Sequence, residues 1–580
     1  MFSGIIKEKT EQIVSLKEEI KWLWNVSCMY KKEIFIITVI SIIGSIFSLS
    51  INLCLKYVID AVTGEKKYSI VFMAATAVVL MLSNIGFSAL SSKIRIRIYI
   101  KIQNELQLDV YRTIFKAQWE SLREYRKGDL INRLNSDVNA VSNGVIGWWP
   151  NLLSVLTQFV YSFILIVMND PIMALIAFIS APFSAFMSRF MLRRMHEHNL
   201  KVKELNADMM AYQTDSFVNL QYIKAFGIAD VVNRKLAEKQ QKFKEENLDY
   251  NNVSVFMNAV LKLAGLLVTF VSYAWGIYRL HEGYITYGTM VMFLQITLTL
   301  SGSFNSLLKV IPLTVNLGTS ASRIINIENL PTENIIPTEE ERQFIDKSFH
   351  TGLTLKCENV TFSYSDDPDV YILKNTSFCI EKGETVAIIG GSGLGKTTFF
   401  RLILGILQCT KGKIELENIY GDKIPIRASL RELFAYVPQG NTMTEGTIAE
   451  NIRMIKPTAT DEEIISVLKM SCAYEFVKKL PNGIHTAIGE SGNGFSEGQM
   501  QRISIARALI KDAPVILFDE VTSALDEETE LKLLENIKTH LENKTVIFVT
   551  HKLNTLQISD KIFKVENKRF QQIEYTISKR

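Results

Sequence analysis

The chain has 580 residues, which is too long for one hydrophobic core and so predicts several domains. Its formal net charge is only +4, and its lysines and arginines form no block of the kind that tracks nucleic-acid phosphates, so nucleic acid is not an expected partner. The 6 cysteines contain no C-x-x-C pair. This argues against a disulfide scaffold or structural zinc and favours a reducing compartment around the second half of the chain.

Residues 1–32 are predicted to form a cytoplasmic or interfacial segment. They contain glutamate and lysine in nearly equal measure, unlike a transit peptide, and no short apolar core near Met1 resembles a cleavable signal. The mixture of basic and aromatic residues around Trp22 and Trp24 is typical of a helix lying in a membrane interface, although a plain soluble helix would also accommodate it. Membrane targeting is therefore expected to depend on the apolar spans that follow.

Residues 33–320 contain about six stretches with roughly the 20 apolar residues that a membrane-spanning helix needs. Buried helices of a soluble protein are a poor alternative, because such helices are usually shorter and apolar on one side only. The predicted fold of this region is an all-α six-helix transmembrane domain with long cytoplasmic helical extensions, surrounded by a lipid bilayer. The stretches lie near 34–57, 70–92, 145–168, 172–192, 253–279 and 287–311.

Two long polar connections, over about 93–144 and 193–252, carry many lysines and arginines. Positive charge concentrates in cytoplasmic loops near span ends, so both connections and both termini are expected on the cytoplasmic side. The connections on the opposite side are short, as at Asn169–Pro171. At about 1.5 Å per residue, helices over the long connections would stand well clear of the membrane.

Polar side chains within the predicted spans are candidates for cargo contact, because burying a polar group in lipid is costly. Amides can instead join helices, and aromatic residues can instead form the interfacial belt. An aromatic, modestly polar cavity would suit an amphipathic cargo. The candidates are Gln158, Asn258, Lys262, Gln295, Asn305, Trp148, Trp149, Tyr161, Tyr273, Trp275 and Phe304.

Residues 351–580 are predicted to form an α/β nucleotide-binding domain, joined to the membrane domain by a linker over 321–350. A β-branched run over 386–390 leads into G-x-x-x-x-G-K-[ST] and then into a helical pattern over 399–407. In this context backbone N–H groups wrap phosphates at a helix N-terminus, Lys396 reaches the β- and γ-phosphates, and Thr397 offers its hydroxyl to Mg²⁺. The predicted ATP-binding residues of the loop are Gly390, Gly391, Ser392, Gly393, Leu394, Gly395, Lys396, Thr397 and Thr398.

A second apolar strand, over 514–520, ends in the carboxylates of Asp519 and Glu520. In such nucleotidases a strand-terminal aspartate holds Mg²⁺, and an adjacent glutamate can polarise the attacking water. Many strands end in acidic residues, so this signal is weak alone. It gains weight because it follows the phosphate loop.

The order of these motifs resembles that of the ATP-binding cassette (ABC) transporters, whose signature near LSGGQ follows the phosphate loop. Here Phe495, Ser496, Glu497, Gly498 and Gln499 stand in its place. The resemblance implies that Ser496 and Gly498, with Gln499 beside them, bind the γ-phosphate of ATP held by another copy of the domain. Phe495 and Glu497 depart from the family's leucine and first glycine, and the glutamate adds a negative charge near the polyphosphate.

Further positions match the family one by one. Tyr364 resembles the aromatic residue that stacks on adenine, and Gln439 resembles the glutamine that links Mg²⁺ and water to the membrane domain. Ser523–Asp526 resembles the loop joining the two sites, and His551 resembles the histidine that senses the γ-phosphate. The resemblance thus implies catalytic roles for Glu520, His551 and Gln439, and places Thr397, Gln439 and Asp519 at the metal.

The resemblance covers nearly the whole chain, because spans fused ahead of one cassette are the plan of the ABC exporter half-transporters. The pattern G-D-L-x-x-R-x-x-x-D over 128–137 is similar to their first cytoplasmic excursion. By the same analogy, residues 119–125 and 215–223 would be the coupling helices that touch the cassettes. The family's usual C-terminal helices are expected to be trimmed, since the chain ends soon after His551.

One phosphate loop and one signature per chain imply a dimer, and a homodimer is the simplest assembly. The expected function is export of an amphipathic peptide, drug or lipid by alternating access, driven by ATP with Mg²⁺. The expected location is a cell membrane, and the lysine- and isoleucine-rich composition is compatible with a bacterial plasma membrane.

Several alternatives stay open or are disfavoured. A subunit of a heterodimeric exporter and a channel or regulatory protein on the same fold remain open, because fold does not determine function. A soluble cassette ATPase acting on ribosomes or DNA is disfavoured by the apolar stretches. A leader-cleaving peptide exporter is disfavoured because no peptidase domain precedes the first span.

Overall fold

The computed structural model describes residues 19, 21–64, 69–125, 127–175, 198, 201–202, 204–349, 351–364, 371–391, 393–440, 442–489 and 494–574. The chain divides into two compact units. The first comprises Met1–Phe115 and Arg126–Asn329, and the second comprises Lys116–Tyr125 and Leu330–Arg580. The bounds predicted for the domains from the sequence remain a prediction.

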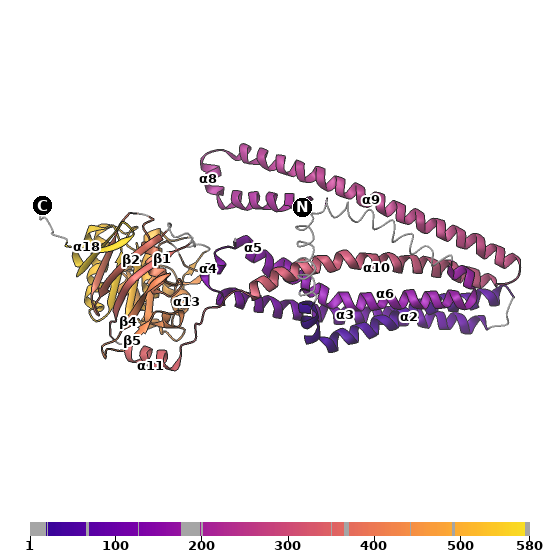
Figure 1. Ribbon diagram of the computed structural model, residues 1–580, viewed down its shortest axis with the longest axis horizontal. Coiled ribbons are helices and arrows are strands. Elements are labelled where there is room, and N and C mark those ends of the chain that lie inside the picture. The colour runs from indigo at the N-terminus through magenta and orange to yellow at the C-terminus, as the bar shows by residue number, and fades with distance from the viewer. Residues whose placement is uncertain are drawn as a thin grey trace. The chain divides into compact units, whose positions relative to one another are not determined.

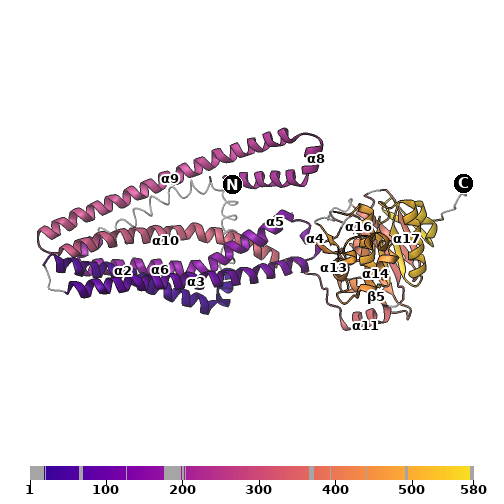
Figure 2. The ribbon, with the colours of Figure 1, turned by 180° about the vertical axis from the view of Figure 1, so that it is seen from behind.

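The first unit is helical (Figure 1). Three of its long helices, α2, α6 and α10, pack against one another, and α9 packs against α10. Figures 1 and 2 show α2, α3, α6 and α10 running beside one another along their length. In chain order the elements are α2 (Lys31–Val62), α3 (Ile70–Lys116), α5 (Lys127–Asn132), a π-helix (Arg133–Asp137), α6 (Val138–Asn169), α8 (Leu220–Ala225), α9 (Ala229–His281) and α10 (Tyr287–Glu328).

Within the described residues, three helical stretches are long and apolar enough to cross a membrane: Lys31–Val62, Ile70–Lys116 and Lys127–Asn169. A shorter apolar stretch, Tyr287–Leu300, begins α10. The stretch expected over 172–192 lies mostly outside the described residues. The number of six spans therefore remains a prediction.

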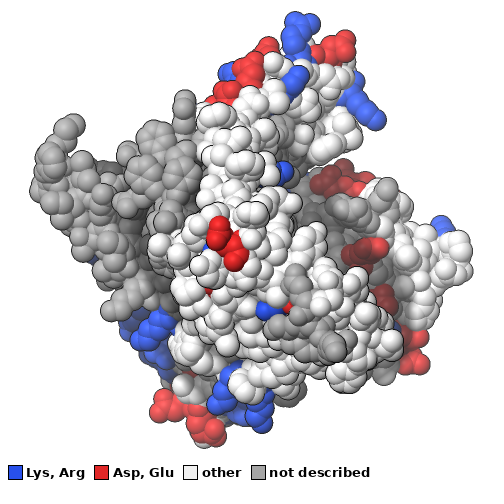
Figure 3. Space-filling view, turned by 90° about the vertical axis from the view of Figure 1, so that its right-hand side faces the viewer, with Lys and Arg blue, Asp and Glu red and all other residues white. Residues whose placement is uncertain are grey.

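Figure 3 views the end of the helical unit at which α9 leads into α10. The surface drawn there is mainly uncharged, with only a few charged side chains near its middle. The surface that would face lipid is the side of the long apolar helices, where charged groups would be costly.

Close packing of α2 on the start of α10 depends on Gly288. Its backbone N–H donates to Asp60 Oδ1 at 2.9 Å, and Asp60 is fully buried. A Cβ atom at position 288 would lie 2.2 Å from the backbone oxygen of Lys56 and 2.4 Å from Asp60 Oδ1. The absence of a side chain thus lets the two helices approach each other.

Replacing Gly288 by alanine is expected to lower the free energy of unfolding by about 1–3 kcal/mol, because backbone atoms of α2 would have to move away. Thermal unfolding in detergent, followed by tryptophan fluorescence, measures the change. Gly302→Ala in the same helix is the control, since a Cβ there meets no atom within 4 Å. Equal melting temperatures for the two variants would contradict the packing argument.

The second unit contains a four-stranded antiparallel sheet in the order β2-β1-β4-β5 and a six-stranded sheet in the order β12-β11-β3-β10-β9-β6. All neighbours in the six-stranded sheet are parallel except β11 and β12. The strands are β1 (Thr354–Ser363), β2 (Tyr371–Ile380), β3 (Thr385–Ile389), β4 (Lys411–Glu417), β5 (Lys423–Pro425), β6 (Phe434–Val437), β9 (Val515–Asp519), β10 (Thr545–Val549), β11 (Lys561–Glu566) and β12 (Arg569–Ile573).

The central strands are buried on both faces. In β9, Val515 and Leu517 pack into one apolar cluster, whereas Ile516 and Phe518 pack into another. Continuous apolar runs of this kind are typical of parallel sheets covered on both sides. Helices covering the sheet and completing the unit are α11 (Glu339–Ser348), α12 (Lys396–Ile403), α13 (Ile448–Arg453), α14 (Asp461–Met470), α15 (Tyr474–Val477), α16 (Glu497–Leu509), α17 (Glu527–His540) and α18 (Leu553–Ile558). Figure 2 shows α13, α14 and α16 together, where they pack against one another.

The segment Lys116–Tyr125, which includes the short helix α4 (Trp119–Leu122), belongs to the second unit. Its backbone pairs with residues 331–333. The N–H of Gln118 donates to the oxygen of Pro331 at 2.8 Å, and the N–H of Glu333 donates to the oxygen of Lys116 at 2.7 Å. We call Lys116–Tyr125 the inserted segment.

A helical unit of long apolar helices followed by an α/β unit confirms the predicted fold class, apart from the number of spans.

Candidate nucleotide-binding site

The phosphate loop follows β3, which lies between β11 and β10 inside the six-stranded sheet. Two of its glycines have backbone conformations that other residues rarely adopt, with φ of 81° at Gly393 and 92° at Gly395. Gly395 is the N-cap of α12, and a Cβ there would lie 2.5 Å from Cγ2 of Ile372. The loop thus presents backbone N–H groups at a helix N-terminus, the arrangement that binds phosphate. Ser392 lies outside the described residues.

Lys396 is the buried cation of the site, with 6% of its surface exposed. Its Nζ donates to the backbone oxygen of Gly390, lies 2.8 Å from Nε2 of His551, and lies 4.0 Å from Oε1 of Glu520. Burial lowers the pKa of Lys396, and the carboxylates of Glu520 and Asp519 oppose that shift. The side chain is therefore held at the centre of the loop, beside both strand-terminal acids.

The strand-terminal acids lie at the end of β9. Glu520 has a φ of 52°, an uncommon conformation for a residue with a side chain, and its N–H donates to the oxygen of Val549 in the neighbouring strand. Gln439 Nε2 donates to Glu520 Oε2 at 2.7 Å, and His551 Nε2 lies 3.6 Å from Glu520 Oε1. The structure therefore brings together the three residues expected to be catalytic.

Asp519 is almost fully buried beside the loop. Burial raises the pKa of its carboxyl group, while hydrogen bonds from Thr397 and Tyr436 oppose the shift and the charge of Glu520 adds to it. The hydroxyl of Tyr436 donates to Asp519 Oδ2 at 3.3 Å. The carboxylate of Asp519 and the hydroxyl of Thr397 are thus adjacent oxygen donors, as Mg²⁺ requires.

A cavity of about 390 Å³ is lined by Lys396, Thr397, Gln439 and Glu520 among others. Tyr364 closes one side of it, with its hydroxyl 3.2 Å from Thr398 Oγ1 and accepting from Arg401 Nη1 at 3.1 Å. The lining residues are Arg123, Tyr364, Ile372, Gly393, Gly395, Lys396, Thr397, Thr398, Arg401, Gln439 and Glu520. The cavity thus combines phosphate-binding groups with an aromatic ring.

The signature sequence forms the start of α16. Ser496 is the N-cap: its Oγ accepts from the N–H of Gln499 at 3.3 Å, and Gln499 Oε1 accepts from the N–H of Ser496 at 2.9 Å. A Cβ at Gly498 would lie 2.7 Å from the oxygen of Ala524, so glycine allows close approach to the loop 523–526. None of Ser496, Gly498 and Gln499 is among the described residues that line the phosphate-loop cavity.

The two departures in the signature have local structural explanations. Phe495 is partly buried, with its ring centroid 6.4 Å from that of Phe476 in an edge-to-face arrangement. Glu497 is exposed in the first turn of α16, where a carboxylate is favourable to the helix dipole.

Each of the two units matches a known protein family. Residues 34–304 match the family described as the ABC transporter transmembrane region, and residues 373–523 match the family described as ABC transporter. The chain belongs to the ABC transporter family. As a member it binds ATP and couples ATP hydrolysis to transport across a membrane.

Relatives of this ABC transporter have the same organisation. YgaD of Bacillus subtilis, which is named as a multidrug export ATP-binding/permease protein, is 28% identical over 546 residues, covering 93% of each chain. A protein of Staphylococcus aureus with the same type of name is 28% identical over 563 residues, again covering 93% of each. An ATP-bound structure of a bacterial Atm1-family ABC exporter has the same fold, with a TM-score of 0.80, 22% identity and coverage of 93% of this chain and 95% of that one.

Three cavity residues of the transporter, Arg123, Ile372 and Arg401, were missed as site residues by the reasoning from sequence. Arg401 lies one turn after Thr398 on α12, and its position in the helix following the phosphate loop could have indicated it. Arg123 comes from the inserted segment, far away in sequence. It falls within residues 119–125, which the resemblance predicts to touch a cassette, but no local pattern indicates its place in the nucleotide cavity.

The membrane candidate Gln158 joins three helices of the transporter. Its Nε2 donates to Ser45 Oγ on α2 at 3.3 Å, and its Oε1 accepts from Ser303 Oγ on α10 at 3.3 Å. Ser45 Oγ also lies 2.6 Å from Ser154 Oγ on α6. These contacts favour helix–helix association as the role of Gln158.

The other membrane candidates differ in exposure. Trp149 packs edge-on against Trp148 and against Trp24 of the N-terminal helix, with ring centroids 4.4 and 5.3 Å apart. Lys262 is exposed, whereas Gln295, Tyr161 and Trp275 are partly buried. Tyr273 is 44% exposed. The side chains of Asn258, Phe304 and Asn305 lie outside the described residues.

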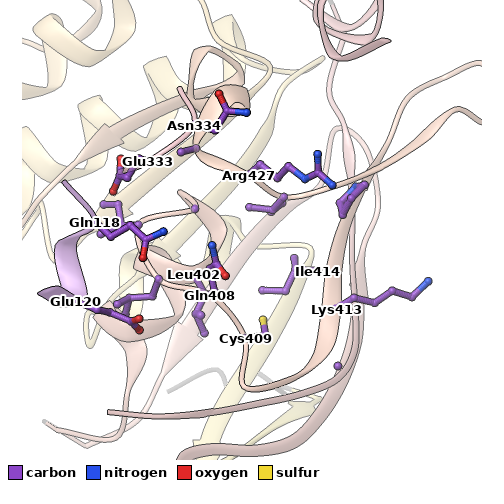
Figure 4. Close-up of a pocket in the computed structure, with 17 residues that line it drawn as sticks. Gln118, Glu120, Glu333, Asn334, Leu402, Gln408, Cys409, Lys413, Ile414 and Arg427 are labelled. Atoms are coloured by element: carbon purple, nitrogen blue, oxygen red, sulfur yellow. The ribbon is translucent and has the colours of Figure 1, made fainter. Parts of the chain in front are cut away.

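Another cavity, of about 350 Å³, lies at the junction of the inserted segment with the nucleotide-binding domain. Figure 4 shows Gln118 and Glu120 on one side of it, with Glu333 and Asn334 nearby and Lys413 on the opposite side. Its floor includes the apolar residues Leu402 and Ile414. Residues of the inserted segment and of the nucleotide-binding domain thus line this cavity together.

Proposed function

We propose that this ABC transporter exports an amphipathic cargo as a homodimer with two composite Mg–ATP sites. The observation that carries the proposal is the separation of the signature from the cavity: Ser496 and Gly498 stand outside the lining that surrounds Lys396. Ser496 is exposed, at the N-terminus of a 13-residue helix. A second copy could place its own signature against the phosphates held by the first.

In this proposal, the residues around Lys396 divide the chemistry of ATP hydrolysis. Lys396 and the N-terminus of α12 hold the phosphates. Glu520 accepts a proton from the attacking water, while Gln439 and His551, both within 3.6 Å of its carboxylate, position that water and the γ-phosphate.

The donor set around Thr397 fits Mg²⁺. Thr397, Asp519 and Gln439 offer a hydroxyl, a carboxylate and an amide, and oxygen ligands are those that Mg²⁺ prefers. When bound, Mg²⁺ would neutralise charge on the β- and γ-phosphates. The buried carboxylate of Asp519 would then gain a second counter-charge, in addition to that of Lys396.

The tip of the second cytoplasmic excursion supports assembly with a second copy. Apolar side chains around α8 are strongly exposed, including Phe217 at 73% and Phe226 at 75%. An exposed apolar patch of this kind is typical of a surface that contacts a partner. In the proposal this tip contacts the cassette of the second copy, which offers a hollow of about 320 Å³ lined by Leu404, Ile406, Arg431, Phe434, Ala435, Tyr436, Met454, Ile455, Arg507, Ala508 and Lys511.

The membrane domain and the names of the relatives support the proposed cargo class. Trp148 and Trp149 are partly buried aromatic residues and Lys262 is an exposed cation within the predicted spans, and an amphipathic molecule could use either kind of contact. Related proteins of Bacillus subtilis and Staphylococcus aureus are named for multidrug export. We therefore assign a drug-like, peptide or lipid cargo and, by the same analogy, a location in a bacterial plasma membrane with the cassette in the cytoplasm.

The test is ATP hydrolysis by the purified chain in lipid nanodiscs, measured with a panel of drugs, peptides and lipids and with Glu520→Gln as the blank. Stimulation by one class, followed by ATP-dependent uptake of that compound into inside-out proteoliposomes, is the expected result. Glu520-dependent hydrolysis without uptake of any compound would contradict export and favour a channel or regulatory role. A second cassette chain that purifies with this one would contradict the homodimer.

A further inference from the structure

Arg123 reaches the nucleotide cavity from outside the core of the nucleotide-binding domain. It belongs to the inserted segment, yet it lines the same cavity as the phosphate loop, Gln439 and Glu520. Its guanidinium carbon lies 4.4 Å from the ring centroid of Tyr364. At this distance the guanidinium is in cation–π contact with the ring.

The backbone around Arg123 is held by the nucleotide-binding domain itself. The N–H of Arg123 donates to the oxygen of Trp119 at 3.0 Å, closing the turn of α4. Two residues before α4, Ala117 pairs with Thr332. Glu333, next to Thr332, forms an ion pair with Arg431 at 2.6 Å. Figure 4 shows Gln118 and Glu333 close to each other in this junction.

The partner ring is also held in place. Thr398 and Arg401 both hydrogen-bond the hydroxyl of Tyr364, and the ring of Phe362 meets it edge-on with centroids 4.8 Å apart. Among the described residues, no aspartate or glutamate forms an ion pair with Arg123. The guanidinium thus has an aromatic partner and no acidic partner in the part of the chain that the structure describes.

We propose that Arg123 is a nucleotide-base contact: the guanidinium and the ring of Tyr364 form one stacked surface against which the base of the nucleotide packs. The proposal rests on the proposed role of Tyr364 in base stacking. A guanidinium is planar and weakly hydrated, so it stacks on aromatic faces as lysine does not. Because Arg123 belongs to the inserted segment, nucleotide affinity would then depend on the first cytoplasmic excursion.

The test compares a ligand that has a base with one that lacks it. ADP binding to the purified full-length chain is measured by titration calorimetry, and inorganic tripolyphosphate is measured by its competition with ADP. Arg123→Ala is expected to weaken ADP binding about fivefold, as loss of one cation–π contact of ordinary strength would, and to leave tripolyphosphate unchanged. Arg123→Lys keeps the positive charge but lacks a planar guanidinium, so it should weaken ADP binding almost as much as Arg123→Ala.

Arg112→Ala is the matched control, because Arg112 is an exposed arginine on α3 whose side chain is 62% exposed. Equal losses for ADP and tripolyphosphate in Arg123→Ala would overturn the proposal and assign the guanidinium to a phosphate. Unchanged ADP binding in Arg123→Ala would overturn it outright.

The same experiment distinguishes an error in the proposed function from an error in the role of Arg123. Wild-type protein that binds no ADP would contradict the nucleotide site as a whole. Loss in Arg123→Ala without any loss in Tyr364→Ala would contradict base stacking on Tyr364 and overturn the shared surface. If the two side chains form one surface, the double variant should lose less affinity than the two single losses combined.

Discussion

Replacing Glu520 by glutamine is expected to reduce ATP turnover by about 100- to 10,000-fold, the usual range for removal of a general base. Glutamine has nearly the same shape, and its side-chain oxygen can still accept from Gln439, which now donates at 2.7 Å. The variant should therefore fold normally and still bind ATP. Steady-state phosphate release measures turnover, and retention of radiolabelled ATP after rapid gel filtration measures binding.

Glu528→Gln provides the control for this experiment. Glu528 is an exposed glutamate in the first turn of α17, where its Oε1 accepts from Lys532 Nζ at 2.6 Å. Turnover in that variant should equal that of the wild type. If Glu520→Gln hydrolysed ATP as fast as the wild type, Glu520 would not be the general base. His551, whose Nε2 lies 3.6 Å from the same carboxylate, would then be the next candidate.

Mixing Lys396→Ala chains with Ser496→Ala chains is expected to restore activity that neither variant has alone. In a mixed dimer, the intact loop of one chain faces the intact signature of the other, so one of the two composite sites is complete. With random pairing and independent sites, the mixture should recover about one quarter of wild-type activity, because half the dimers are mixed and each has one complete site of two. The two chains are co-expressed, and hydrolysis is compared with that of each variant expressed alone.

Thr460→Ala is the control for the loss of a helix cap in Ser496→Ala. Ser496 also caps α16, so its loss could cost about 1 kcal/mol of stability without any role in catalysis. Thr460 caps α14 through the same kind of capping box with Glu463, and Thr460→Ala should lose a similar stability but no activity. No recovery in the mixture would show that loop and signature act within one chain.

Local motifs predicted the phosphate loop well, because the spacing of its glycines and apolar residues determines the strand, the turn and the helix. The run over 386–390 lies on β3 and the loop following it, and the helical pattern after Thr398 lies on α12. The strand over 514–520 is β9. Glycines that a turn requires, and apolar runs buried on both faces, are visible within a few residues of sequence.

Features that depend on distant pairing were not predictable in this way. The inserted segment pairs with residues 331–333 across some two hundred positions; the resemblance predicted contact with a cassette for residues 119–125, but no local pattern indicates this backbone pairing. The π-helix at Arg133–Asp137 is similar: Arg323 Nε lies 3.2 Å from Asp137 Oδ2, and Ser320 donates to Asp137 Oδ1 at 3.0 Å. Such contacts are set by the tertiary structure, and the local pattern shows only charged residues in a helix.

The pairing of the inserted segment with residues 331–333 also has a structural consequence. The last residue of α3 is Lys116, and α10 ends at Glu328, five residues before Glu333. Because the N–H of Glu333 bonds to the oxygen of Lys116, the ends of these two helices are tied together by the backbone. The two stretches of chain that enter the nucleotide-binding unit from α3 and from α10 are therefore joined to each other there by backbone hydrogen bonds.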